Sequence, residues 1–220
     1  MSAELLLFDL DGTLTDSAPG IISSLKLALA DLSLPAPDDE VLFGLLGPPF
    51  WVSLPTIGVP EDRVAEVVEA YRAHFEAGAI FTGNSVYPGV VEMLTQLQQR
   101  GTLMAVATSK PQPAARRIIE HFGLAEFFVD GLESVFGADE AGVKRPNKAS
   151  VIAHALAQTP VVGGGESITM VGDREHDVHG AAEHGIKAIG VAWGYGAPGE
   201  LAQAGACAIA QTPAELLDLL

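Results

Sequence analysis

The chain has a single cysteine, Cys207, among its 220 residues. An internal disulfide and a zinc site built from several thiolates are therefore both excluded. Basic residues are also scarce, because 12 Lys and Arg stand against 28 Asp and Glu, for a net charge of −16. Nucleic acids and anionic membranes both attract basic surfaces. We therefore expect neither of them as a partner.

Long apolar runs are missing as well. No stretch approaches 18 uninterrupted apolar residues, so no membrane-spanning helix is expected. The start, MSAELLLFDL, has no basic segment ahead of a long apolar run, so we expect no secretory signal and a cytoplasmic location. The composition, with 48% hydrophobic and 18% charged residues, is typical of a globular chain. One domain, or one domain with an insert, fits this length, while monomer and homodimer both stay open.

Short apolar runs alternate with helical patterns over residues 88–220. The predicted buried strands are 5–8, 103–107, 127–129, 168–171, 188–191 and 206–209. The predicted helices are 88–100, 112–122, 147–157, 175–184 and a last one that begins after Thr212. The glycines at 163–165 predict a flexible loop without a dinucleotide-binding pattern. This alternation predicts an α/β fold with a Rossmann-like, doubly wound parallel sheet.

Residues 17–83 have a different character. Helical patterns recur at 19–32, 38–46, 50–56 and 61–77, and no clear buried strand interrupts them. Gly47-Pro48-Pro49 predicts a rigid turn among these helices. We therefore expect a core made of residues 1–16 and 84–220, with a helical cap at 17–83 inserted after the first strand.

Polar residues gather where the predicted strands end, which is where doubly wound sheets bind ligands. They are Asp9, Asp11 and Thr13 after the first strand, Thr108, Ser109 and Lys110 after 103–107, and Asp173, Arg174 and Asp177 after 168–171. Lys144, Arg145 and Lys148 lie where the helix that leads to the strand at 168–171 begins. Carboxylate oxygens of this kind suit Mg²⁺, and a carboxylate can also be a nucleophile toward phosphorus.

Three segments carry a resemblance to a known family. Residues 8–17, FDLDGTLTDS, resemble the first signature of the haloacid dehalogenase (HAD) superfamily. Residues 106–111, VATSKP, are similar to its second signature, and 172–177, GDREHD, to its fourth. The resemblance covers essentially the whole chain. It implies a Rossmann-like core, a cap inserted after the first signature, and Mg²⁺ as cofactor.

The resemblance also implies roles for individual residues. Asp9 would be the nucleophile and Asp11 the general acid and base. Mg²⁺ would be held by the Asp9 side chain, the Asp11 backbone carbonyl and Asp173. Thr108 would bind the transferring phosphoryl group. Asp177 would orient a ligand or the catalytic lysine without holding the metal.

The family further requires one lysine between the second and fourth signatures. Lys148 is the preferred residue, because the segment that it opens resembles a helix of the phosphoglycolate phosphatase and 5′-nucleotidase-like branch. Arg145, three residues earlier, fits the same branch. Lys144 is the alternative. Contacts with the substrate are predicted for Thr13, Ser109, Lys110 and Arg145.

The reaction class follows from Asp11. An alkoxide that leaves phosphorus needs a proton, whereas a halide does not, so the second aspartate favours phosphate chemistry. The resemblance implies a Mg²⁺-dependent phosphatase that hydrolyses a small phosphomonoester through an aspartyl-phosphate. A sugar phosphomutase, a pyrophosphatase and a non-catalytic protein of this fold remain alternatives. Phosphoglycolate, a nucleoside monophosphate, pyrophosphate and sugar phosphates all remain open as substrates.

Overall fold

The computed structural model describes residues 4–48, 50–139, 143–159 and 167–220. The glycine loop predicted at 163–165 and Pro49 of the predicted turn lie outside these residues. The chain divides into two compact units: Met1–Thr15 joined with Val86–Leu220, and Asp16–Ser85. We call the first the core unit and the second the cap unit.

The core unit is built on a parallel sheet of six strands in the order β5-β4-β1-β6-β7-β8. The strands are β1 (Leu5–Phe8), β4 (Leu103–Pro111), β5 (Val135–Ala138), β6 (Ile168–Gly172), β7 (Lys187–Val191) and β8 (Ala208–Ala210). From β1 the chain adds strands on one side and then returns to add them on the other. This confirms the predicted doubly wound sheet.

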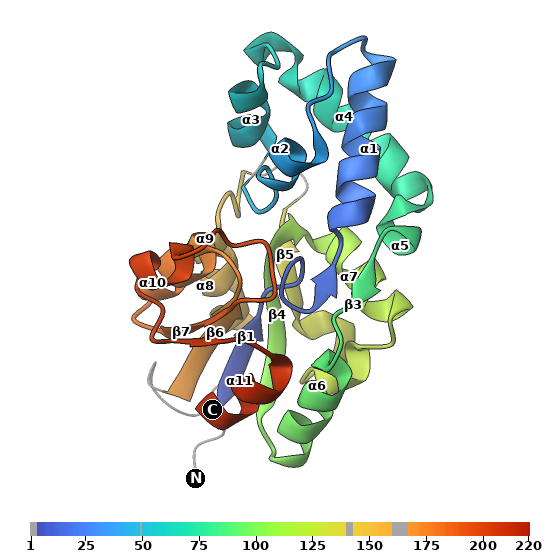
Figure 1. The fold of residues 1–220 in the computed structure, drawn as a ribbon. Helices are drawn as coiled ribbons and strands as arrows, with labels where there is room; N and C mark the ends of the chain where they lie inside the picture. The colour runs from blue at the N-terminus through green and yellow to red at the C-terminus, as the bar shows by residue number, and fades with distance from the viewer. Residues whose placement is uncertain (1–3, 49, 140–142, 160–166) are drawn as a thin grey trace. The chain divides into compact units, whose positions relative to one another are not determined.

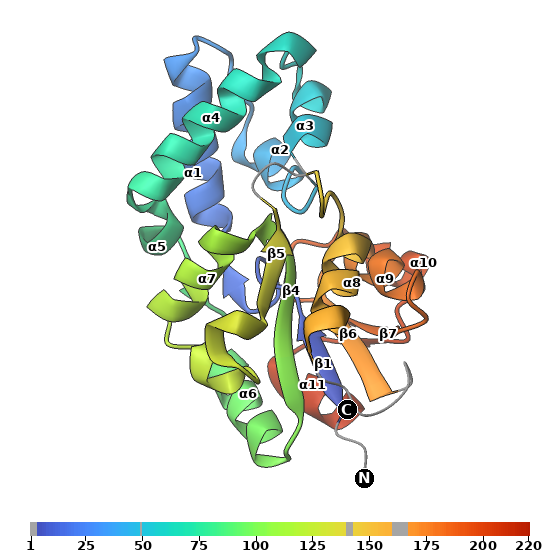
Figure 2. The same cartoon turned by 180° about the vertical axis from the view of Figure 1, so that it is seen from behind.

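Helices cover both faces of the sheet (Figures 1 and 2). They are α6 (Val90–Gln99), α7 (Gln112–His121), α8 (Lys148–Gln158), α9 (Glu175–Ala182), α10 (Glu200–Ala204) and α11 (Pro213–Leu219). Helices α8 and α9 lie on one face, and α6 and α11 on the other. All four residues of β1 are therefore fully buried, which explains why this strand is a continuous apolar run.

The register of the central strands decides which residues meet at the edge of the sheet. Phe8 at the end of β1 pairs with Val106 of β4 and with Val171 of β6. The residues that follow these three positions therefore emerge side by side, although they come from three distant parts of the chain.

Two predicted elements of the core unit need correction. The strand expected at 127–129 does not exist, because Ala125–Phe127 and Gly131–Ser134 are 3₁₀ turns and the strand is β5, at Val135–Ala138. The strand expected at 103–107 continues to Pro111, with a shift in its pairing to β5 after Thr108. Helix α10 had no counterpart among the predicted elements.

The cap unit is helical, as its sequence pattern predicts. Its helices are α1 (Ala18–Asp31), α2 (Asp39–Phe43), α3 (Phe50–Ser53), α4 (Val64–His74) and α5 (Ile80–Thr82). The single helix predicted at 61–77 is a 3₁₀ turn, then α4, then a π-helical turn at Phe75–Ala79 that contains Gly78 in a non-helical conformation.

The cap unit has a hydrophobic core of its own, in which Leu25, Leu29, Leu54 and Val67 are almost completely buried. The chain passes between the units at two short paired strands, β2 (Thr15–Asp16) and β3 (Ser85–Val86). Among the described residues, none of the helices combines the length and the apolar character that crossing a membrane requires.

Candidate active site

Asp9 directly follows β1 and stays within the framework of the sheet. Its backbone N–H donates to the Val171 carbonyl at 2.9 Å, which continues the pairing of β1 with β6. Its Oδ1 accepts a hydrogen bond of 2.7 Å from the N–H of Leu10. With 8% of the residue exposed, Asp9 is a nearly buried carboxylate held at the carboxyl edge of the sheet.

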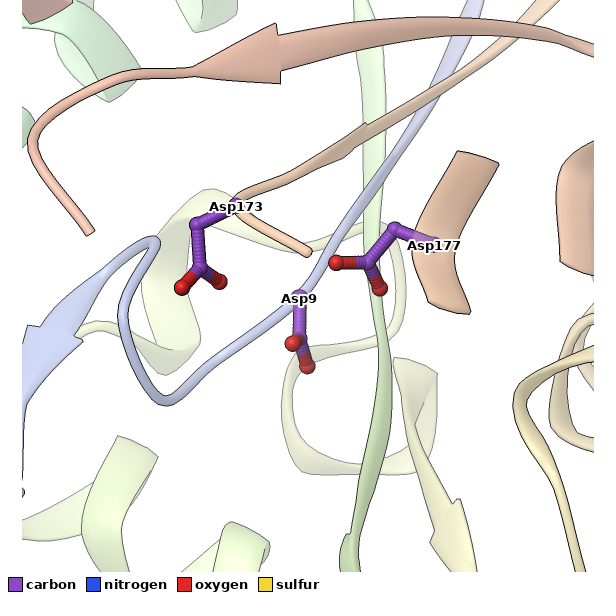
Figure 3. A group of neighbouring side chains, drawn as sticks. All are labelled: Asp9, Asp173 and Asp177. Atoms are coloured by element: carbon purple, nitrogen blue, oxygen red, sulfur yellow. The ribbon is translucent and has the colours of Figure 1, made fainter. Parts of the chain in front are cut away.

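Asp9 belongs to a cluster of three buried carboxylates, with Asp173 and Asp177 (Figure 3). Asp173 follows β6 and Asp177 lies in the first turn of α9. Each residue offers one oxygen, and these three oxygens lie within 4.8 Å of one another. Burial raises the pKa of Asp9 to about 6, where Lys148 opposes the shift and Asp177 adds to it. Burial, followed by Asp177 and Asp9, raises the pKa of Asp173 well above its usual value.

Lys148 brings positive charge into this cluster. Its Nζ lies 2.9 Å from Asp9 Oδ1 and 2.7 Å from Asp177 Oδ1, and it donates to the Ala107 carbonyl at 3.0 Å. Burial alone would lower the pKa of Lys148, but the carboxylates of Asp177 and Asp9 outweigh it and raise that pKa. The ammonium is therefore charged in the site.

The position of Lys148 follows from the start of α8. Asn147 is the N-cap, and its side chain accepts from the N–H of Ser150 at 2.9 Å. The Ser150 hydroxyl in turn accepts from the N–H of Asn147, at 3.3 Å, so the two residues form a capping box. Lys148 is the first residue of α8, so this cap fixes the backbone position from which its side chain extends.

The Asp173 carboxylate is held by donors on two different loops. The Thr13 hydroxyl donates to Oδ1 at 3.1 Å, and the N–H of Tyr195 donates to Oδ2 at 2.8 Å. Gly12 packs beside it with φ of +88°, and a Cβ there would lie 2.2 Å from Oδ2. Glycine is therefore required at position 12 both by its backbone conformation and by the approach of the carboxylate.

Asp11 and Lys110 form a second charged pair. The Lys110 Nζ donates to Asp11 Oδ2 at 2.7 Å, with 6% of the lysine side chain and 19% of the aspartate side chain exposed. The hydroxyl of Thr108, which is buried, accepts from the N–H of Lys110 at 3.2 Å. The loop after β1 and the end of β4 thus meet, as the shared register of their strands requires.

The structure also describes the remaining residues predicted for the site. Ser109 is half-buried and follows Thr108 on β4. Arg145 donates through Nε to the Gly137 carbonyl at 2.7 Å, at the end of β5. Lys144 is exposed. Between the two candidate lysines, the one that touches the carboxylate cluster is therefore Lys148.

Two residues at the site escaped the sequence prediction. Trp193 and Tyr195 lie in the segment after β7, and the Trp193 indole N–H donates to the Thr13 carbonyl at 3.0 Å. The available signal was topological: this segment leaves a predicted strand at the same edge of the sheet. It carries no charged side chain, so the pattern of acids and bases along the sequence does not point to it.

Together, the described groups offer hard oxygen ligands, a carboxylate nucleophile, a buried cation and a partly exposed carboxyl group. The oxygens suit a divalent cation, because such a cation would offset the burial and the mutual repulsion that raise the pKa values of Asp9 and Asp173. The cation, Lys148 and the Thr108 hydroxyl can also stabilise an oxyanion such as phosphate.

Comparisons with known proteins agree with this geometry. A curated tyrosine-protein kinase PtkA from Mycobacterium tuberculosis is 45% identical over 89% of this chain, and the match spans 64% of that protein, slightly less than two thirds. A 5′-nucleotidase from Pseudomonas aeruginosa is 39% identical over 89% of this chain and 86% of its own length. A solved haloacid dehalogenase-like protein, SP0104 from Streptococcus pneumoniae, superposes with a TM-score of 0.90 at 28% identity, over 99% of this chain and 98% of its own.

The model of the haloacid dehalogenase-like hydrolase family matches residues 6–191, which include every residue of the carboxylate cluster and Lys148. Family, sheet topology and carboxylate cluster therefore agree, and this chain belongs to the haloacid dehalogenase-like hydrolase family.

Proposed function

We propose that this protein is a Mg²⁺-dependent phosphatase that hydrolyses a small phosphomonoester through an aspartyl-phosphate. One observation carries the proposal: the Asp9 carboxylate stands at the end of β1, 2.9 Å from the buried ammonium of Lys148, within a cluster of carboxylates. A buried nucleophile needs charge partners that bring an anionic substrate to it, and this arrangement supplies both a cation and metal ligands.

The metal site that we propose uses the Asp9 side chain, the Asp11 backbone carbonyl and Asp173. Asp177 lies 2.7 Å from Lys148, so we assign it to orienting the lysine. When bound, Mg²⁺ would neutralise part of the charge of the phosphate and of the surrounding carboxylates.

The chemistry of the chain then runs in two displacements. An oxygen of Asp9 forms a bond to phosphorus while the bond from phosphorus to the ester oxygen breaks, and Asp11 gives its proton to the leaving alkoxide. In the second step a water gives a proton back to Asp11, its oxygen attacks the same phosphorus, and the bond to Asp9 breaks. The products are an alcohol and inorganic phosphate.

The other predicted residues serve the substrate in this proposal. Thr108 and Lys148 hold the non-bridging oxygens of the transferring group as their charge changes. Lys110 exchanges its contact with Asp11 for one with the substrate, and Ser109 and Arg145 line the approach to the site. The Thr13 hydroxyl donates to Asp173 Oδ1 at 3.1 Å, so it lies at the same edge of the sheet as the proposed substrate site.

The substrate that we propose is a small phosphorylated metabolite such as phosphoglycolate or a nucleoside monophosphate. The motif resemblance and the 5′-nucleotidase relative support these two classes. A sugar phosphomutase remains the alternative within the same chemistry. Phosphate release across a metabolite panel, compared with interconversion of hexose phosphates, separates these possibilities.

The relatives named tyrosine-protein kinase favour a second candidate, transfer of a phosphoryl group to a tyrosine hydroxyl. The two candidates differ in the acceptor, which is water for a phosphatase and a phenol for a kinase. Incubation with ATP labelled in its γ-phosphate, Mg²⁺ and a tyrosine-containing peptide distinguishes them. Label on the peptide supports the kinase, whereas phosphate release from monoesters without labelled peptide supports the phosphatase.

Asp9→Asn tests the proposed nucleophile. The amide keeps the size of the side chain but cannot form the acyl phosphate, so we expect turnover to fall by at least about 1,000-fold. Asp218→Asn is the matched control, because Asp218 is an exposed aspartate in α11 of the same unit. Phosphate release with Mg²⁺ is the measurement, and normal turnover by the Asp9→Asn protein would rule out the mechanism.

A further inference from the structure

The segment after β7, residues 192–196, lies against Asp173. The N–H of Tyr195 donates to Asp173 Oδ2 at 2.8 Å, while the Thr13 hydroxyl holds the other oxygen at 3.1 Å. Each carboxylate oxygen thus has a donor, and the two donor residues, Thr13 and Tyr195, are far apart in the sequence. The orientation of the carboxylate depends on these two loops keeping their relative position.

Trp193 is the direct link between the two loops. Its indole N–H donates to the backbone carbonyl of Thr13 at 3.0 Å, and the side chain is half-buried. Thr13 therefore receives a hydrogen bond at its carbonyl and gives one from its hydroxyl to Asp173. Trp193 is therefore linked to Asp173 through the backbone and the side chain of Thr13.

The same segment also makes close backbone contact with Asp173. A Cβ on Gly194 would lie 2.3 Å from Asp173 Cβ and 2.3 Å from the Gly12 carbonyl oxygen. A Cβ on Gly196 would lie 2.4 Å from the Asp173 carbonyl oxygen. Any side chain at either position would push the segment away from the aspartate.

We propose that residues 192–196 are a positioning element for the metal ligand Asp173. In this proposal, the hydrogen bond from Trp193 holds the element against the loop that carries Asp9 and Asp11. The inference rests on the proposed function, because it takes Asp173 as a Mg²⁺ ligand. A carboxylate that is already oriented loses little freedom when it binds the cation, so loosening its support weakens the binding.

Trp193→Phe tests this proposal, because it removes the indole N–H and keeps an aromatic ring. We expect the dissociation constant for Mg²⁺, measured by isothermal titration calorimetry, to rise roughly three- to tenfold. The chain has two tryptophans, and Trp51 of the cap unit is 53% exposed, so Trp51→Phe is the matched control and should bind Mg²⁺ as the unmodified protein does. Circular dichroism in EDTA verifies that each variant is folded.

Gly194→Ala is the second variant, since its methyl group displaces either Asp173 or the segment itself. We expect a weakening of Mg²⁺ binding of at least about tenfold. A purely structural role for the segment would lower the melting temperature in EDTA while leaving the dissociation constant unchanged. That result in both variants would overturn the proposal.

Asp173→Asn separates this inference from the proposed function. If this variant binds Mg²⁺ as the unmodified protein does, Asp173 is not a ligand, and both the proposed metal site and the positioning role are overturned. If it loses Mg²⁺ binding while Trp193→Phe and Gly194→Ala retain it, the metal site stands and only the positioning role is overturned. Weakened binding in all three variants supports both.

Discussion

The ammonium of Lys148 lies between the carboxylates of Asp9 and Asp177, with the Ala107 carbonyl as a further acceptor. Both carboxylates are almost completely removed from water. Their repulsion is balanced by the lysine, and the lysine remains charged because of them. The lysine thus favours the ionised form of Asp9, and the two carboxylates favour the charged form of the lysine.

Lys148→Met should therefore reduce both stability and turnover. It leaves two buried carboxylates without their cation, so we expect the free energy of unfolding to fall by about 3 kcal/mol. Lys144→Met is the matched control: Lys144 is exposed, and we expect a change within about 0.5 kcal/mol and normal turnover. Urea unfolding and phosphate release measure the two effects. Loss of turnover in Lys144→Met but not in Lys148→Met would reverse the choice between the two lysines.

The raised pKa of Asp9 predicts a dependence of stability on pH. Its pKa is about 6 in the folded protein and 3.8 in the unfolded chain, so between these values the folded state binds more protons. The contribution of Asp9 is fully present below pH 3.8 and is lost as the pH rises through 6. Without metal, Asp9→Asn should gain stability relative to the unmodified protein as the pH rises from 4 to 7, by a few kcal/mol at most. Urea unfolding in EDTA at several pH values tests this. The free energy of unfolding of Asp9→Asn minus that of the unmodified protein should rise with pH, and a fall would contradict the prediction.

At the scale of elements, the accuracy of the sequence prediction followed the clarity of the apolar pattern. The apolar run at 168–171 and the helical pattern at 112–122 are present as β6 and α7. Strand β5 was missed because Gly137 interrupts its run, which leaves only Val135 and Phe136 as large apolar residues. The apolar residues at 127–129 resembled a strand, but Phe127 ends the first 3₁₀ turn and the next turn begins at Gly131, which leaves no room for a strand.

The cap unit contains a close contact that its sequence pattern does not indicate. The N–H of Gly20 in α1 donates to the Gly83 carbonyl at 2.8 Å, and a Cβ on Gly83 would lie 2.3 Å from the Gly20 Cα. The start of α1 and the end of α5 can approach this closely only because both residues lack side chains.

Gly83→Ala should therefore destabilise the cap unit. The added methyl group meets backbone atoms that cannot rotate away, and we expect a loss of about 1–3 kcal/mol in the free energy of unfolding. Gly44→Ala is the control, because its nearest neighbour would be 3.4 Å away and its backbone is helical. We expect that change to be neutral or to stabilise by up to about 1 kcal/mol. Thermal unfolding compares the two, and equal melting temperatures would refute the close contact.

At the scale of the whole molecule, the described residues include hydrophobic clusters that belong to different units. One lies between the sheet and the helices α8 and α9, and another lies within the cap unit, between residues 16 and 85. Every residue proposed for catalysis and metal binding belongs to the core unit. The two units can therefore unfold separately when the free energy that couples their unfolding is small.

Leu54→Ala tests this independence. Leu54 is fully buried in the core of the cap unit, so we expect a local loss of about 2–5 kcal/mol. Amide hydrogen exchange should become faster within residues 16–85 and stay unchanged in β1, β4 and β6. The dissociation constant for Mg²⁺ should also stay unchanged. Uniformly faster exchange in both units would show that they unfold together.

The sequence by itself determined the class of fold, the helical insert and the chemical types gathered at the edge of the sheet. These properties follow from periodicity and spacing, because a buried parallel strand is an apolar run and ligand-binding residues come directly after it. Asp9, Thr108 and Asp173 could be assigned to one edge in this way.

Only the tertiary structure decided which of these groups touch. It placed Lys148 rather than Lys144 against Asp9, paired Asp11 with Lys110, and brought Trp193 to Thr13. Such contacts depend on the register of strands, the starting point of a helix and the path of a loop, which join residues up to 180 positions apart. Local spacing carries no information about them, because contact energy is set by three-dimensional distance and burial rather than by separation along the chain.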